Sequence, residues 1–109
     1  MKAILGMTKV GVAQLENGSY VGYDKDNYRY IATDDLSKAH PIMGDLELNL
    51  ERIMHAFSKQ VCRRTRASLI IKDYVYMNDL SKSCFLETMP IQARQALLAP
   101  AYAYEYERG

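Results

Sequence analysis

The sequence predicts an α+β fold in which an antiparallel sheet packs against one long amphipathic helix and one shorter helix. Three observations support this prediction. An Asn-Gly pair lies between two apolar runs, one segment carries apolar residues at helical spacing, and the elements follow the order β-β-β-α-β-α-β. The sheet would contain an N-terminal three-stranded meander plus one or two further strands. The 109 residues fit a single globular domain, residues 1–109, which is long enough to bury a core without metal or disulfide support.

The first strand is predicted at residues 3–15, where apolar side chains occupy both parities and therefore both faces. Gly6 and Gly11 interrupt this strand and indicate a bulge, a bend or the close approach of another backbone. The Asn17-Gly18 pair then predicts a tight hairpin, because both residues tolerate the positive φ angles of a type I′ turn. Two further strands, at 20–23 and 28–32, complete the meander, and a polar turn at 24–27 connects them.

Two helical segments follow the meander. Residues 33–39 are typical of a single helical turn, with Thr33 or Asp34 as its N-cap. The long helix is predicted at residues 45–63, with Asp45 as its N-cap. Its apolar stripe, which should lie across the sheet, consists of Leu46, Leu50, Ile53, Met54, Phe57 and Val61.

The next strand is predicted at residues 68–77, which are rich in β-branched and aromatic side chains. Its central Ile70, Ile71 and Val75 indicate that the strand is well buried. Residues 80–89 are compatible with either a loop or a short helix.

The C-terminal part of the chain predicts a second helix and a last strand. Pro90 suits a first helical position, with Thr88 available as the cap, and apolar residues continue at helical spacing to Leu98. Residues 101–107 alternate strictly with period two, so a strand here would place three tyrosines on one face: Tyr102, Tyr104 and Tyr106.

Composition excludes several classes of protein. The formal net charge is +1, which argues against a polyanion mimic or a histone-like protein, because both act through a large field of one sign. No apolar run approaches the roughly 20 residues of a membrane-spanning helix, so we expect no membrane partner. No secretion signal is visible, and two cysteines in a chain that is not exported are expected to be reduced. These features predict a cytoplasmic protein.

Motifs for catalysis or metal binding are weak. The acidic turn at 24–27 resembles a calcium loop in composition, but Arg29 occupies the position where such a loop needs glycine. His55 and Cys62 are seven residues apart on the long helix, yet no CxxC or HxxxH spacing accompanies them. Nucleophile-elbow, Walker and dinucleotide-binding motifs are missing from the sequence. We therefore expect neither an enzyme nor a bound metal or cofactor.

Charge is distributed unevenly along the chain. Seven acidic residues lie between Asp24 and Glu51, whereas the segment from Arg52 to Lys72 contains six basic residues and no acidic residue. Its centre is an arginine cluster at the end of the long helix: Arg63, Arg64 and Arg66. Such a cluster can bind nucleic-acid phosphates, can complement the helix dipole from a solvated loop, or can bind an acidic protein.

We expect a non-enzymatic protein that binds another macromolecule. In its short length, tyrosine-rich hairpins and lack of catalytic motifs, the chain is similar to small accessory proteins of phages and mobile elements. This similarity implies an inhibitor that acts by protein–protein contact, for example on a host defence nucleoprotein complex.

The expected partner is a protein or nucleoprotein, and the alternative is nucleic acid held by the arginine cluster and exposed tyrosines. Self-association into a homodimer through the terminal tyrosine strand is compatible with either. The residues expected to contact the partner are Arg63, Arg64, Arg66, Tyr102, Tyr104 and Tyr106.

Overall fold

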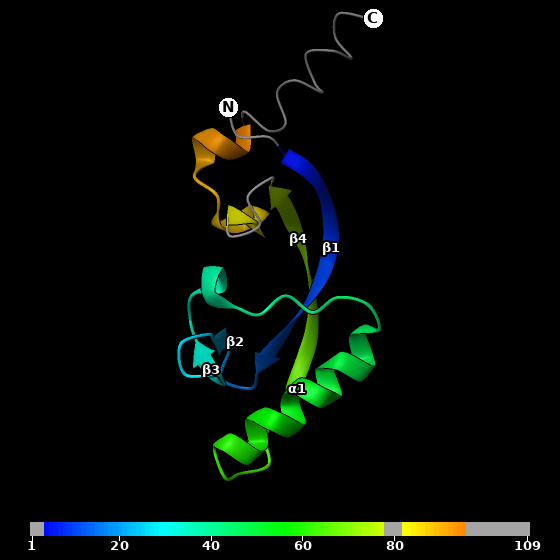
Figure 1. Cartoon of the computed structure of the whole chain (residues 1–109), viewed down its shortest axis with the longest axis vertical. Helices are drawn as coiled ribbons and strands as arrows, with labels where there is room; N and C mark the ends of the chain where they lie inside the picture. Colours follow the sequence, from blue (N-terminus) through cyan, green and yellow to red (C-terminus); the bar gives the residue numbers. More distant parts are fainter. Residues whose placement is uncertain (1–3, 78–81, 96–109) are drawn as a thin grey trace, which may run out of the picture.

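The computed structural model describes residues 4–77 and 82–95, and it confirms the α+β fold (Figure 1). A five-stranded antiparallel sheet has the strand order β3-β2-β1-β4-β5. Its strands are β1 (Ile4–Leu15), β2 (Tyr20–Asp24), β3 (Arg29–Thr33), β4 (Ala67–Met77) and β5 (Cys84–Phe85). The helical elements are η1 (Leu36–Lys38), α1 (Leu46–Gln60), η3 (Leu86–Thr88) and a helical turn at 91–95.

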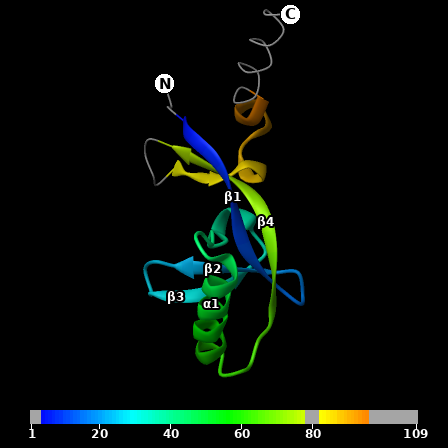
Figure 2. The ribbon, with the colours of Figure 1, turned by 90° about the vertical axis from the view of Figure 1, so that its right-hand side faces the viewer.

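A long ribbon of β1 and β4 forms the centre of the sheet. The two strands pair without interruption from Leu15 opposite Ala67 to Gly6 opposite Tyr76, and the register shifts between Ile4 and Gly6. The predicted irregularity near Gly6 is therefore present. Figure 2 shows that the hairpin of β2 and β3 runs across this ribbon, so the sheet is strongly curled.

The curl arises where the connection between η1 and α1 inserts beside β1. Gly11 and Ile42 exchange two backbone hydrogen bonds of 2.9 and 2.8 Å, and Gly22 forms a bridge with Ala39. Both glycines lie at close approaches, but only Gly22 is required by a backbone contact, because the Leu69 side chain beside Gly11 can shift. A Cβ on Gly11 would lie 2.7 Å from Cδ1 of Leu69, and one on Gly22 would collide with the backbone carbonyl of Lys38. The predicted close approach at Gly11 is thus confirmed.

The two faces of β1 contribute to two separate cores, as its apolar residues of both parities predicted. Ala13 and Leu15 pack beneath α1, together with Ile53, Met54 and Phe57. On the opposite face, Val10 and Val12 pack with Ala39 and Phe85. The helix therefore covers one end of the ribbon, whereas η1 and β5 cover the other face towards the other end (Figure 1).

The helix begins as predicted but ends early. The carboxylate of Asp45 accepts a hydrogen bond of 3.1 Å from the Leu48 amide, which confirms it as the N-cap. The helix ends at Gln60 rather than near residue 63, and Val61 is 45% exposed instead of completing the apolar stripe. The reason is a reversal of the chain at Cys62, which is described below.

Other details of the sequence-based prediction need correction. The cap of η1 is Asp35, whose carboxylate accepts from the Ser37 amide, and not Thr33 or Asp34. Thr88 donates its hydroxyl to the carbonyl of Phe85 and does not cap the C-terminal helix. In β4, Val75 is fully buried but Ile71 is 50% exposed, because no described element covers that point of the strand.

The ambiguous segment 80–89 contributes a short strand, β5, and a 3-10 turn, η3. The predicted last strand, with Tyr102, Tyr104 and Tyr106, and the end of the second helix lie outside the described residues. Among the helices of the described ranges, none has both the length and the apolar character to span a membrane.

Candidate interaction site: the arginine loop

The arginine cluster lies in a loop, residues 61–66, that connects α1 to β4; we call it the arginine loop. Cys62 has a left-handed backbone conformation with φ of 54°. The Cys62 amide donates to the Lys59 carbonyl (3.2 Å), and the Arg63 amide donates to the Ser58 carbonyl (3.1 Å). This pair of bonds is a Schellman motif, which ends a helix and reverses the direction of the chain. The left-handed position is usually glycine, so the cysteine concealed the helix end from sequence reasoning.

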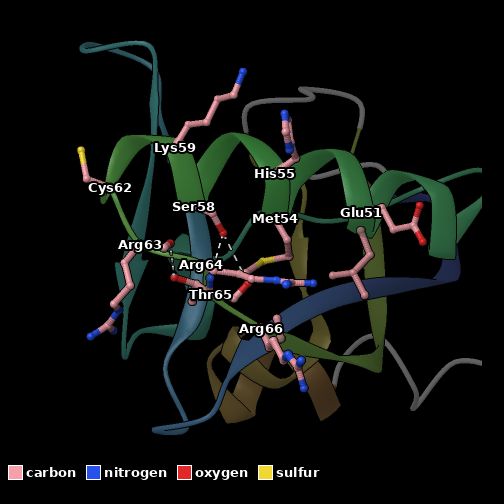
Figure 3. A pocket seen from close by; sticks show the side chains of 12 residues that line it. Glu51, Met54, His55, Ser58, Lys59, Cys62, Arg63, Arg64, Thr65 and Arg66 are labelled. Carbon is pink, nitrogen blue, oxygen red and sulfur yellow. Dashed lines mark hydrogen bonds between the residues drawn. The ribbon is translucent and has the colours of Figure 1, made fainter.

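A second set of hydrogen bonds clamps the loop to the helix. The Thr65 amide donates to Oγ of Ser58 at 3.0 Å, and that hydroxyl lies 3.4 Å from the Thr65 carbonyl, to which it donates. The Thr65 hydroxyl in turn donates to the Arg63 carbonyl at 3.1 Å. Figure 3 shows the two bonds of Ser58 as dashed lines between the helix and the loop, and the third bond within the loop. The clamp fixes the backbone that carries the three arginines.

A groove of about 820 Å³ lies between the arginine loop and α1. Its apolar lining includes Leu50, Met54 and Ala67. In Figure 3 the side chain of Arg64 extends beneath α1 past Met54, whereas Arg63 points away at the opposite end. Arg64 therefore brings a charge over an apolar surface.

A second groove, of about 740 Å³, lies on the other side of the arginine loop. The same three arginines line it, together with the turn after β1 and the exposed Val61. Ala32 of β3 contributes to its wall. The arginine loop is thus a ridge between two hollows, accessible from both sides.

Several acidic residues of the chain are engaged in local structure, whereas Glu51 and Glu16 line the first and the second groove beside the arginines. Besides the cap residues Asp35 and Asp45, Asp34 accepts from the Ser19 hydroxyl at 2.8 Å. Asp24 accepts from Asn27 within its own turn, and this bond lowers the pKa of the Asp24 carboxyl. The hydrogen bonds from Ser37 likewise lower the pKa of Asp35. These aspartates stabilise turns and helix ends and are not arranged to neutralise the arginines.

The arginines have no such partners within residues 4–77 and 82–95. The ion pairs in these ranges join Lys9 to Asp73 and Lys72 to Glu87, each at 2.7 Å. Lys72, which the sequence placed in the same basic run, is therefore already paired. The cluster available to a ligand is Arg63, Arg64 and Arg66.

The tyrosines lie away from the arginine loop, at least in the part of the chain that the structure describes. Tyr23 and Tyr30 pack edge to face at 5.0 Å, and His40 lies about 6 Å from both rings. Burial lowers the pKa of His40. Tyr74 packs against Tyr76 and Phe85 on the other face of the ribbon. None of the described tyrosines lines either groove beside the arginine loop.

Groups for metal binding are not assembled in the described ranges. No set of three or more His, Cys, Asp or Glu side chains there is placed to hold a metal ion. His55 and Cys62, which share a helical spacing, lie at separate points along the first groove in Figure 3, since the helix ends at Gln60, before Cys62. Cys62 and Cys84 are both free thiols.

Comparison of the chain with protein-family models, with curated proteins and with solved structures finds no match, so its function is inferred from the arginine loop and its two grooves.

Proposed function

We propose that the chain is a non-enzymatic binding protein whose arginine loop holds an acidic segment of a partner protein. The observation that carries this proposal is the clamped ridge itself. Three arginines are fixed between two grooves, and no ion pair in the described ranges engages them. Binding would replace water around each guanidinium by carboxylates, which arginine can hold with two parallel hydrogen bonds.

Preorganisation supports a binding role for the arginine loop. A flexible loop loses conformational entropy when a partner fixes it, and this loss weakens binding. Here the Schellman motif and the bond between Ser58 and Thr65 have already fixed the backbone in the free protein. Arginine is also among the residues that most often dominate the energy of protein interfaces.

The surroundings favour a protein over a nucleic acid. Recognition of unpaired bases relies on aromatic side chains for stacking, and the described tyrosines lie outside both grooves. The larger groove instead offers Leu50, Met54 and Ala67, which suit apolar side chains between the acidic ones of a protein segment. Nucleic acid remains the alternative that the experiment below must distinguish.

Inhibition is part of the proposal. A small binding protein without catalytic groups acts on its partner by occupying a surface, and an acidic surface would be masked by the arginine loop. A cytoplasmic setting belongs to the same proposal and is supported by the two free thiols. The contribution of Tyr102, Tyr104 and Tyr106 stays a prediction, since they lie outside the described residues.

The test is affinity capture of the full chain from its native host, with nuclease treatment of the lysate. The double variant Arg64→Glu with Arg66→Glu is compared with the wild type. A matched control, Lys25→Glu with Arg29→Glu, makes the same charge change at the β2–β3 turn, where neither residue lines a groove.

A stoichiometric protein that resists nuclease and is lost only from the arginine-loop variant supports the proposal. Recovery of nucleic acid alone would favour the alternative and overturn it. Capture that is equal for all three chains, or bait without any partner, would also contradict the proposal.

A further inference from the structure

We infer that a second copy of this chain binds along the free edge of β4, so that the two sheets join across a two-fold axis. This interface does not depend on the arginine-loop proposal, although it adjoins the arginine loop and shares Ala67 with the first groove. The edge in question is the stretch Ala67–Ile71, where β4 has β1 on one side and no described strand on the other. Figure 2 shows this stretch on the outer side of the ribbon, below β5 and η3.

The backbone groups of this edge can be assigned from the register. Gly11 directs its amide and carbonyl to Ile42, away from β4, so the alternation of an antiparallel ladder directs Val10 and Val12 towards β4. Their partners on β4 are Lys72 and Ile70. Even-numbered residues of β4 thus bond to β1, and odd-numbered residues point outward.

A second observation gives the same assignment. The Met77 amide donates to Ser83 on the outer side of β4, at 2.9 Å. By alternation, the amides and carbonyls of Ala67, Leu69 and Ile71 also point outward. No hydrogen bond in the described ranges engages these groups outside the sheet. They form a row of unpaired donors and acceptors.

The other long edge of the sheet is protected. The side chain of Gln60 donates to the Tyr30 carbonyl at 2.8 Å and accepts from the Tyr30 amide at 3.0 Å. The side-chain amide of Gln60 therefore pairs with the backbone of Tyr30 in the way that a neighbouring strand would. Proteins usually protect exposed edges by such covers or by charges, prolines and bulges.

The β4 edge has none of these devices. Its sequence from 67 to 71 is Ala-Ser-Leu-Ile-Ile, without charge or proline, and its pairing to β1 is regular throughout. Ile71 is 50% exposed, although isoleucine favours burial. An uncharged, regular and apolar edge is the kind that pairs with another chain.

A second copy fits this edge because the edge is complementary to itself. In an antiparallel pairing centred on Leu69, Leu69 lies opposite Leu69 of the second copy. Ala67 of each copy then lies opposite Ile71 of the other. Every one of these pairs brings outward donors to outward acceptors. Each Ile71 then packs against the second copy, and the contact obeys the two-fold symmetry that most homodimers have. The pairing ends before Lys72, which is joined to Glu87 of η3.

The test is the molar mass of the full chain by light scattering, together with amide hydrogen exchange. Ile71→Lys adds a charge to the edge and should give a monomer, because pairing would bury that charge. Met7→Lys is the matched control: Met7 is also 50% exposed, but it lies on the central strand β1. The wild type and Met7→Lys should both be dimers at about 100 μM, which is far above the Kd of a stable homodimer.

Hydrogen exchange identifies the surface used. In the dimer the amides of Leu69 and Ile71 should be protected, and in Ile71→Lys the amide of Leu69 should exchange at least tenfold faster. A wild-type monomer would overturn the inference, whether or not these amides are protected. A dimer that persists in Ile71→Lys with both amides exchanging freely would place the interface elsewhere and would overturn it as well.

Discussion

The bond between Ser58 and Thr65 is the part of the arginine loop that a single substitution can remove. Ser58→Ala deletes one hydroxyl that accepts from the Thr65 amide and donates to the Thr65 carbonyl. The site is partly buried beside the first groove, so the Thr65 amide would lose its acceptor and regain only part of that bond from water in the groove.

The expected change in the free energy of unfolding is the sum of two opposing effects. An unsatisfied, partly buried backbone group costs about 1–3 kcal/mol. Ser58 lies within α1, where alanine has a higher helix propensity by roughly 0.5 kcal/mol. The variant should therefore be less stable by about 0.5–2.5 kcal/mol. The sign of the change is informative, because helix propensity alone predicts a gain.

Urea denaturation followed by circular dichroism measures this difference. Ser68→Ala is the matched control, because Ser68 is exposed on β4 and its side chain makes no hydrogen bond in the described ranges. It should change stability by less than about 0.5 kcal/mol. A Ser58→Ala protein as stable as the wild type, or more stable, would refute the structural role assigned to the clamp.

Three further predictions follow from the backbone and from burial. Gly22→Ala should destabilise the fold by about 1–3 kcal/mol in urea melts, because its methyl group would meet the Lys38 carbonyl, whereas Gly6→Ala has nothing within 4 Å and should be neutral or slightly stabilising. Cys62→Gly should raise the unfolding free energy by about 1 kcal/mol, since a side chain at φ of 54° is strained; a loss of stability would show that the thiol has a structural role. Burial lowers the pKa of His40, so its contribution to stability is complete above the unfolded value of about 6.5 and is lost as the pH falls through the lower folded value. His40→Asn should flatten this part of the pH profile, and an unchanged slope below the unfolded value of about 6.5 would contradict the assignment.

Most of the fold could be predicted from the sequence because its signals are local. Asn17-Gly18 specified the position of the first hairpin, although only Gly18 has a positive φ and the turn is therefore not the predicted type I′. Asp45 with the apolar stripe specified the start and orientation of α1. The curl of the sheet could not be predicted in the same way. It depends on the pairing of Gly11 with Ile42, a contact between distant residues that leaves only a glycine as its signal.

The sequence predicted that three arginines cluster at the end of the long helix, but not the conformation of the loop that carries them. Its geometry depends on a left-handed Cys62, where the usual glycine signal is missing, and on a serine and a threonine of ordinary composition. The free edge of β4 was hidden for another reason. The residue type of Ile71 predicted a core position, and only the strand order shows that no described strand pairs with the outer edge of β4 at this residue.

The central claim is that Arg64 and Arg66 bind a partner protein, and the most direct test is the Kd of that partner once it has been captured and purified. Calorimetry should show that Arg64→Glu with Arg66→Glu weakens binding by more than about 30-fold, which corresponds to about 2 kcal/mol for interface residues of this kind. The control, Lys25→Glu with Arg29→Glu, should retain the wild-type Kd within a factor of about three. Equal affinities for the arginine-loop variant and the wild type would contradict the account.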